Sequence, residues 1–522
     1  MSKYKYPRSS GVLMPVTSLP GPYGVGVLGQ QAMNFIDFLC DTGFHAWQIL
    51  PVEHANGWCN SPYRAVSAFA GEPNLIDPEM LLEMGLVTED ELNERKNGLS
   101  ETRVEYGLVR EKQWKLLRTA YSRLEGKPYE KFKPFWLDEY TLFFALKQHF
   151  GENAWFNWED VSLRRHDKAA IMKFRNEHSE ELEFHRFVQW LFDMQWNKIR
   201  KYAAKRKISL IGDMPIYVAD DSAEVWSRQD LFEVDKNDKF TSIGGVPPDY
   251  FSEDGQRWGD PIYNWKLLAD EGFKWWVDRL GANLARYDVV RLDHFRGFES
   301  YWSIPAESKT AKTGTWKKGP GMSLFKVLKE QLGDLNLSVI AEDLGIIDEK
   351  VERLLEKSEL RGMHVLQFSL LGDADSLPYN IGKGSVTYTG THDNTTTLGW
   401  LYELSHAERD KILFYTGFDG DWQSGGPNSA IAKHWMRVLF ATPSSLAIAP
   451  IQDMLGYGED TRTNTPGTDS GNWQFRIREG VLDEVDKEFY KHLHEVFVRL
   501  DPVKEFKKKA KQETKSSVSP TE

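Results

Sequence analysis

Eight short apolar segments, each followed by polar, Gly or Pro residues, recur along the 522-residue chain. Amphipathic stretches lie between several of them, such as 324–332 and 348–355, the second of which opens with acids that suit a helix N-terminus. Strands that alternate with helices form parallel sheets, and eight such units predict an α/β fold, a (β/α)8 TIM barrel. The predicted strands are 11–16, 47–52, 209–218, 289–295, 339–345, 364–369, 385–393 and 446–455.

The predicted strands are unevenly spaced, which indicates insertions. We expect a single catalytic barrel over residues 1–502, with helix-rich subdomains inserted after strand two, at about 53–205, and after strand three, at about 219–280. Within the second insertion, 244–258 carries Gly, Pro and aromatic residues without periodicity, which predicts an ordered loop able to cover a site. Residues 503–522 are rich in Lys and Ser and predict a tail without function.

Composition excludes several classes of function. The formal net charge of −12 argues against a nucleic-acid partner, because phosphate binding needs clustered Lys and Arg. Two cysteines, Cys40 and Cys59, cannot build a disulfide framework, which favours a reducing compartment. We find no signal-peptide pattern and no apolar run of about 18 residues, so we expect a cytoplasmic protein without a membrane span. The 19 Trp, 20 Tyr and 29 Phe residues suit stacking on sugar rings.

Ionisable residues gather where the predicted strands end. The stretch 289–298 runs from an apolar strand into Arg291, Asp293, His294 and Arg296. Charged groups are rare at the end of a buried strand unless they pair or take part in chemistry. Strands three, five and seven also end in acidic or imidazole groups, which are Asp213, Glu342, Asp343, His392 and Asp393.

These groups should share one site, because catalytic residues of a (β/α)8 barrel lie at the carboxyl ends of its strands. Crowded carboxylates push each other's pKa values apart, so that one stays ionised while another holds a proton. Glycoside cleavage needs that pairing, and retaining enzymes hold the two carboxyl groups about 5–5.5 Å apart. The pattern therefore points to a glycosidic bond as the substrate.

Other interpretations fit the acids taken alone. Asp, Glu and His at barrel ends can bind a metal, although the His-x-His pair of the chain, His492 and His494, lies outside the predicted strand ends and oxygen-only sites are less distinctive. Asp213 or Asp343 can instead orient loops by accepting backbone N–H groups. Cys59, near the end of strand two, is interpreted as a packed thiol, since no His partner is evident for it.

Motifs spread over nearly the whole chain resemble those of the 4-α-glucanotransferases of glycoside hydrolase family 77. Single fragments are weak, but so many in order are specific. They include Ser-Leu-Pro-Gly-Pro-Tyr-Gly at 18–24, Ser-Pro-Tyr at 61–63, Ser-Ala-Phe-Ala-Gly at 67–71, His-Asp-Asn at 392–394, Asn-Thr-Pro-Gly at 464–467 and Gly-Asn-Trp at 471–473.

The resemblance implies a role for each acid. Asp293 would be the nucleophile, Glu342 the general acid and then base, and Asp393 the stabiliser of the oxocarbenium-like transition state. It implies no metal and no cofactor, with maltooligosaccharides and α-1,4-glucans as partners. The implied substrate-binding residues are Tyr63, Asp213, Gln256, Trp258, Arg291, His294, His392 and Asn464.

The expected activity is therefore transfer of α-1,4-glucan segments by retaining double displacement, with glucose released from short donors. An amylase-like hydrolase and a catalytically silent glucan-binding protein are the alternatives. The chain departs from the family pattern at 56–60, where a Tyr-containing stretch is common, at Arg64, where Gln is common, and at Thr395, where Asp is common. These departures leave the outer subsites open, and the oligomeric state is not predicted.

Overall fold

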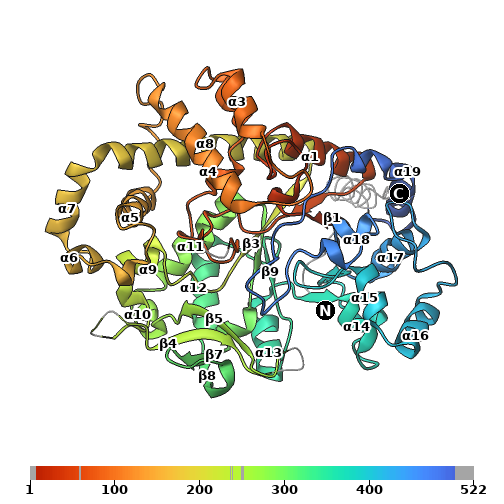
Figure 1. Cartoon of the computed structure of the whole chain (residues 1–522). Helices are drawn as coiled ribbons and strands as arrows, with labels where there is room; N and C mark the ends of the chain where they lie inside the picture. The colour runs from red at the N-terminus through yellow and green to blue at the C-terminus, as the bar shows by residue number, and fades with distance from the viewer. Residues whose placement is uncertain (1–7, 58–59, 236, 238, 249–251, 500–522) are drawn as a thin grey trace, which may run out of the picture.

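Eight parallel strands form the centre of the molecule (Figure 1). The computed structural model describes residues 8–57, 60–235, 237, 239–248 and 252–499, so the predicted tail and Cys59 lie outside the described residues. The strands are β1 (Ser9–Leu13), β2 (Ala46–Gln48), β3 (Ser209–Met214), β6 (Val289–Leu292), β9 (Val339–Ala341), β10 (Met363–Val365), β11 (Val386–Tyr388) and β12 (Leu446–Pro450).

The strands pair in the order β10-β11-β12-β1-β2-β3-β6-β9. The two edge strands approach each other through a parallel bridge between Ile340 and Arg361, and the Ala341 amide donates to the Arg361 carbonyl at 2.8 Å. The sheet is therefore a nearly closed barrel, which confirms the predicted (β/α)8 fold. Each strand overlaps one of the eight apolar segments recognised in the sequence.

Alternate residues of the strands face opposite sides of the barrel wall, as the two-residue period of a strand requires. One set forms a core with its counterparts on the other strands, for example Leu13, Ile211 and Ile340. The other set packs into the main core with the helices, for example Leu210 and Val290. Continuing the inward set on β3, β6 and β9 leads to ionisable residues of the site, which are Asp213, Arg291, Asp293 and Glu342.

The helices connect and cover these strands (Figure 1). Between β2 and β3, where the sequence predicts a helix-rich insertion, lie α2 (Pro78–Glu83), α3 (Glu89–Lys96), α4 (Tyr106–Ser122), α5 (Leu137–His149), α6 (Val161–Arg164), α7 (Lys168–Glu177) and α8 (Ser179–Arg206). The others are α1 (Gln30–Thr42), α9 (Ala223–Ser227), α10 (Trp265–Asp270), α11 (Lys274–Arg286), α12 (Met322–Leu332), α13 (Glu349–Ser358), α14 (Leu366–Leu371), α15 (Thr397–Glu403), α16 (His406–Thr416), α17 (Ala430–Ala441), α18 (Ile451–Met454) and α19 (Lys487–Val496).

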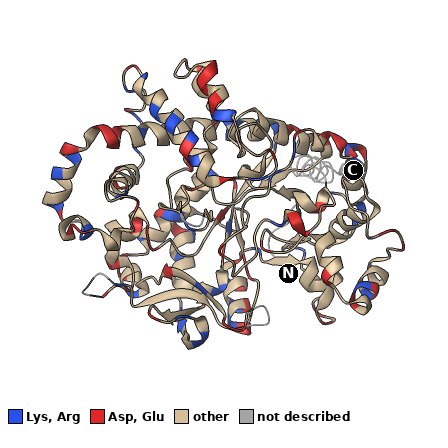
Figure 2. Cartoon of the chain, in the orientation of Figure 1, with Lys and Arg blue, Asp and Glu red and all other residues tan. Residues whose placement is uncertain are grey.

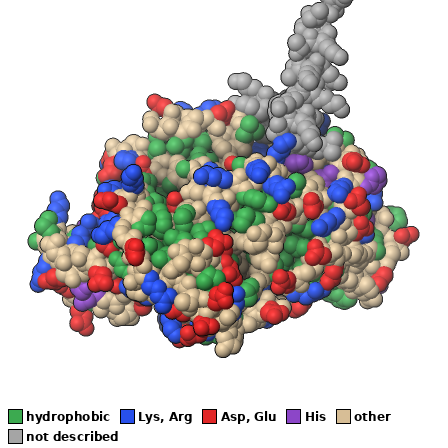
Figure 3. Space-filling model, turned by 90° about the horizontal axis from the view of Figure 1, so that it is seen from above, with side chains coloured by type: hydrophobic (Ala, Val, Ile, Leu, Met, Phe, Trp, Pro, Cys, Tyr) green, Lys and Arg blue, Asp and Glu red, His purple; other side chains and the backbone are tan. Residues whose placement is uncertain are grey.

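Local sequence signals fix several helix ends. Thr88 caps α3 by accepting from the Glu91 amide, while the Glu91 carboxylate accepts from the Thr88 amide, which is a capping box. Asp348 caps α13 through the amides of Lys350 and Val351, as its acidic start predicts. Of the helices that the structure describes, none combines the length and apolar character needed to cross a bilayer. Figure 2 shows acidic and basic residues intermixed along the chain, and Figure 3 shows apolar side chains interspersed with charged ones on the face that it views.

A second sheet corrects the prediction of a loop at 244–258. Strands β4 (Ser242–Val246) and β5 (Gln256–Pro261) pair antiparallel, and β7 (Ser300–Pro305) and β8 (Thr315–Lys318) complete the order β5-β4-β7-β8. Strand β4 lacks alternating apolar residues because Gly244 and Gly245 occupy positions where its backbone packs closely against other groups. A Cβ on Gly244 would lie 2.6 Å from the Tyr217 ring, and one on Gly245 2.1 Å from the Gln256 carbonyl oxygen. The tip residues Tyr250 and Phe251 lie outside the described residues.

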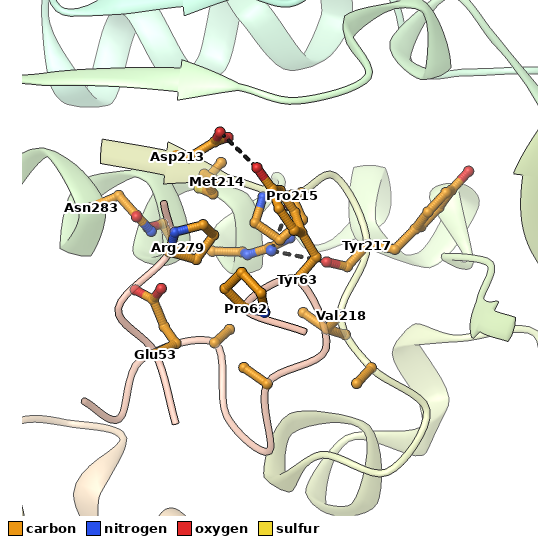
Figure 4. A pocket seen from close by; sticks show the side chains of 14 residues that line it. Glu53, Pro62, Tyr63, Asp213, Met214, Pro215, Tyr217, Val218, Arg279 and Asn283 are labelled. Carbon is orange, nitrogen blue, oxygen red and sulfur yellow. Dashed lines mark hydrogen bonds between the residues drawn. The ribbon is translucent and has the colours of Figure 1, made fainter. Parts of the chain in front are cut away.

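A buried arginine on α11 fixes the chain that follows β3. Arg279 is 2% exposed and donates to the carbonyls of Pro215, Ile216 and Tyr217 at 2.6–3.0 Å. Figure 4 shows its guanidinium beside these residues, under the ring of Tyr63. Buried carbonyls are costly to leave without donors. The contact therefore ties the end of a barrel strand to a covering helix.

We predict that Arg279→Met lowers the free energy of unfolding by roughly 2–4 kcal/mol, because the carbonyls of Pro215 and Tyr217 lose their Arg279 donor and that of Ile216 keeps only the Tyr263 hydroxyl. The midpoint of urea unfolding measures the loss. Lys274→Met on the same helix is the control, since the Lys274 side chain is 73% exposed and its replacement should change stability by about 0.5 kcal/mol or less. Equal midpoints for the two variants would contradict this role of Arg279.

Candidate active site

The site begins with two neighbouring strands in parallel register. Asp213 on β3 and Arg291 on β6 are Cα partners, so their side chains leave the same face of the sheet. Both oxygens of the Asp213 carboxylate accept from Arg291 Nη1 at 2.8 Å. Asp293, two residues after Arg291, lies on the same side, and its Oδ1 is 2.9 Å from the same nitrogen. Strand register thus brings together one cation and two carboxylates.

These three groups differ in their contact with solvent. The side chains of Asp213 and Arg291 are 0% and 3% exposed, whereas that of Asp293 is 28% exposed. Burial acts to lower the pKa of Arg291, but the charges of Asp213 and Asp293 hold that pKa well above its ordinary value. The guanidinium therefore stays charged, and it lies against both carboxylates. Of the two, only the partly exposed Asp293 can also reach a bound ligand.

Glu342 follows β9 and is the protonated partner in the site. Its Oε2 accepts from the His294 amide at 2.8 Å, and its Oε1 accepts from the Leu344 amide at 2.9 Å. Burial, followed by the negative charge of Asp293, raises the pKa of Glu342 to about 8, against the opposing effects of Arg291 and the two amides. The carboxyl is therefore neutral near pH 7. Glu342 thus differs from Asp293 in its burial and in its backbone donors.

His294 connects Asp293, its neighbour in sequence, to Glu342 through its backbone. It adopts the left-handed conformation (φ 49°), which aims its amide at Glu342. Its ring meets the edge of Trp258 with the centroids 4.9 Å apart and the planes at 88°. Burial lowers the pKa of His294 to about 4, so its ring is neutral near pH 7. A neutral imidazole can hydrogen-bond a sugar hydroxyl without adding charge.

Asp393 is held by a segment far along the chain. Its Oδ1 accepts from Asn464 Nδ2 at 2.6 Å, and its backbone carbonyl accepts from Arg462 Nη2 at 2.7 Å. His392 Nε2 lies 3.3 Å from Oδ2 of the same carboxylate. Asp393 is 42% exposed, so it stays open to a ligand. The structure thus brings His392, Asp393 and Asn464 together, as the sequence predicts for residues of one site.

Tyr63 connects the two halves of the site. Its hydroxyl donates to Asp213 Oδ2 at 2.9 Å, and His392 Nε2 lies 2.8 Å from the same oxygen. The Tyr63 and His392 rings stack with centroids 5.3 Å apart, and Trp473 packs at an angle against both rings. Figure 4 shows the Tyr63 hydroxyl pointing at Asp213 from the segment after β2. One phenol therefore links the ends of β3 and β11.

Two residues singled out in the sequence, Gln256 and Asp343, accept hydrogen bonds from other parts of the protein. Gln256 Oε1 accepts from the Trp258 indole Nε1 at 3.1 Å, so these two β5 side chains fix each other. Asp343, for which structural and functional interpretations were both open, accepts from the Met363 amide at 2.6 Å. Burial raises the pKa of Asp343 to about 6. Its contact joins the edge strands β9 and β10, which is a structural role.

Two contacts of the site were not predicted from the sequence. Trp473 was recognised only within the Gly-Asn-Trp motif, without a role, and Arg462 carried no local signal because its partner Asp393 is 69 residues away. The metal alternative has no counterpart in the described part of the chain, where no three or more His, Cys, Asp or Glu side chains are arranged to hold an ion.

Known proteins share sequence with this chain over most of its length. The sequence model of glycoside hydrolase family 77, described as 4-α-glucanotransferase, matches residues 14–482. A 4-α-glucanotransferase of Streptococcus pneumoniae is 41% identical over 504 residues, covering 95% of this chain and 98% of the relative. One from Thermus thermophilus is 41% identical over 491 residues, covering 91% and 96%.

A solved structure extends the likeness to three dimensions. The amylomaltase from Streptococcus agalactiae in complex with acarbose superposes with a TM-score of 0.89 at 38% sequence identity. The match covers 94% of this chain and 99% of that one. The chain therefore belongs to glycoside hydrolase family 77, the 4-α-glucanotransferases.

Proposed function

We propose that this 4-α-glucanotransferase moves α-1,4-glucan segments between maltooligosaccharides by retaining double displacement, with Asp293 as nucleophile and Glu342 as acid and base. The observation that carries the proposal is the contrast between these two carboxyls. Asp293 sits on the Arg291 cation, and Glu342 is buried and neutral near pH 7. Such a pair can attack and protonate at opposite ends of one bond.

In the first displacement, an Asp293 oxygen attacks the anomeric carbon, and the bond from that carbon to the glycosidic oxygen breaks. Glu342 gives its proton to the departing 4-oxygen, so the shortened glucan leaves as an alcohol. The remaining segment is bound to Asp293 as a β-linked ester. Asp393, held by Asn464, is placed to bind sugar hydroxyls as positive charge develops on the ring.

In the second displacement, the 4-hydroxyl of an acceptor glucan gives its proton to Glu342 and attacks the anomeric carbon. The ester to Asp293 breaks, an α-1,4 bond forms, and both carboxyls return to their starting states. Two inversions give net retention. Water competes for the same ester, so transfer prevails only where an acceptor is positioned and water is excluded.

We also propose the partners, the compartment and the domain organisation of the protein. The partners we propose are maltooligosaccharides and longer α-1,4-glucans, and the oligosaccharide analogue acarbose in the related amylomaltase supports a glucan site. We place the protein in the cytoplasm, a proposal supported by the two cysteines in 522 residues. A single barrel with two inserted subdomains remains our proposal for the domain organisation.

We predict that the wild-type protein converts maltotriose into glucose and a ladder of longer chains, and that Asp293→Asn lowers this rate by several orders of magnitude. An amide cannot replace the carboxylate as nucleophile. Chromatography of the products measures both outcomes. Glu349→Gln, an exposed carboxyl on α13, is the control and should keep the wild-type rate.

Three results would contradict the proposal. Shorter chains alone would support the hydrolase, and tight maltooligosaccharide binding without turnover would support a silent binding protein. New linkages with inverted anomeric configuration would exclude double displacement.

A separate test isolates the proton transfer by Glu342. We predict that Glu342→Gln loses activity on maltotriose but still forms a maltosyl-enzyme from α-maltosyl fluoride, because fluoride leaves without a proton. Mass spectrometry of the protein after brief incubation detects the added sugar mass. Equal loss on both donors would show that Glu342 does not act as the acid.

The pH dependence follows from the same residue. Glu342 must be protonated to cleave the donor, so kcat/KM for maltotriose should fall as the pH rises through about 8. The folded pKa also exceeds the ordinary value of 4.5, so the contribution of this group to stability declines as the pH rises from about 4.5 to 8. With α-maltosyl fluoride as donor, the alkaline fall in the first step should be absent. An identical fall with both donors would contradict the assignment.

A further inference from the structure

Arg64 lies beside the active site and joins three segments of the rim. It directly follows Tyr63 on the segment after β2. Its Nη2 donates to Asp220 Oδ1 at 2.6 Å, and its Nη1 donates to the backbone carbonyl of Trp258. Asp260 Oδ1 lies 3.6 Å from Nη1. The guanidinium thus bridges the segments after β2 and β3 to strand β5.

The Asp220 end of this bridge is anchored in the helices. The neighbouring Asp221 pairs with Lys147 of α5, and both side chains are 5–7% exposed. The Asp220 carbonyl accepts from the Trp155 indole at 2.8 Å, and the Asp221 carboxylate accepts from the Trp155 amide at 3.1 Å. Because this end is fixed by buried contacts, Arg64 holds β5 to the barrel rim.

The β5 backbone is shaped to receive the guanidinium. Gly259 follows Trp258 with φ +88°, a conformation that side chains rarely adopt. A Cβ at Gly259 would lie 3.1 Å from Arg64 Nη1. A glycine therefore allows both the turn of the backbone and the close approach of Arg64.

Strand β5 carries the side chains that approach the reacting groups. The Trp258 ring contacts His294, whose amide binds Glu342. The Trp258 indole is held in turn by Gln256. The position of the β5 backbone therefore sets the position of Trp258 over the site, and Arg64 grips that backbone at Trp258 itself.

We propose that Arg64 is a positioning residue that clamps strand β5, and with it the Trp258 ring beside His294, and thereby favours a glucan acceptor over water at the glucosyl-enzyme. The inference rests on the transfer reaction proposed above. It adds a residue that influences whether the glucosyl-enzyme reacts with a glucan acceptor or with water. Arg64 contacts the hairpin backbone and two carboxylates, so it acts through Trp258 and not on the sugar. Its effect should fall on the second displacement more than on the first.

The number of reducing ends distinguishes transfer from hydrolysis. Transfer leaves the number of reducing ends unchanged, because one bond forms for each that breaks, whereas hydrolysis adds one per event. With maltotriose, we expect Arg64→Met to raise the ratio of hydrolysis to transfer about tenfold, which corresponds to about 1.4 kcal/mol in the relative barriers. The rate of the first displacement, measured as maltosyl-enzyme formation from α-maltosyl fluoride, should change less than about threefold.

Two further variants guard against a loss of folding. Asp220→Asn keeps an acceptor of the same shape and should raise the ratio by less than Arg64→Met. Arg64→Lys keeps the charge with a single donor group and should restore part of the wild-type ratio. Arg228→Met is the matched control, because Arg228 also bridges two carboxylates, Asp230 and Glu271, away from β5.

The outcomes are distinct. A wild-type protein that transfers, together with an unchanged ratio in Arg64→Met and Asp220→Asn, would overturn the role of Arg64 and leave the proposed function intact. An equal fall in both displacements with an unchanged ratio would show a merely structural residue and would also overturn the proposal. A wild-type protein that only hydrolyses would overturn the function itself.

Discussion

The site depends on a buried arginine with two carboxylates on one side of it. Arg291 is 3% exposed, and Asp213 and Asp293 both lie within 2.9 Å of its Nη1. Burying a cation is costly unless charges and hydrogen bonds compensate for its lost hydration. Asp213, fully buried, supplies the permanent compensation, which leaves Asp293 attracted to the cation yet open to substrate. Removing Asp213 would shift that burden to the nucleophile.

From this ion pair, a line of contacts crosses the mouth of the barrel. Asp213 accepts from Tyr63, Tyr63 meets His392, and His392 lies beside Asp393. On the other side, the backbone of His294 connects the end of β6 to Glu342 after β9. Asp293, Glu342 and Asp393 are therefore positioned by neighbours on different strands. In a buried site, such connected polar groups hold one another in place.

The barrel and the hairpin contribute different things to the reaction. The strand ends provide the charges and the proton, whereas β5 provides the aromatic surface of Trp258 beside His294. In the mechanism we propose, water and a glucan acceptor compete after the first displacement, so their partition depends on the hairpin. Arg64 belongs to this part of the molecule, and in our proposal it alters that partition without altering the bond that is broken.

The sequence by itself determined the eight strands, the capped helices and the carboxyls at the strand ends, because two-residue and 3.6-residue periods and the composition of strand ends are local properties. The motifs of the chain also carried the family and its activity, as the comparisons confirm. The sequence could not show the β4–β5 hairpin, because the glycines of β4 reflect its close approach to Tyr217 and to β5. Only the tertiary structure decided that Asp213 pairs with Arg291 while Asp343 joins two strands, and that Asn464 holds Asp393. Those assignments depend on strand register and on contacts between residues 20 to 78 positions apart, which no local pattern encodes.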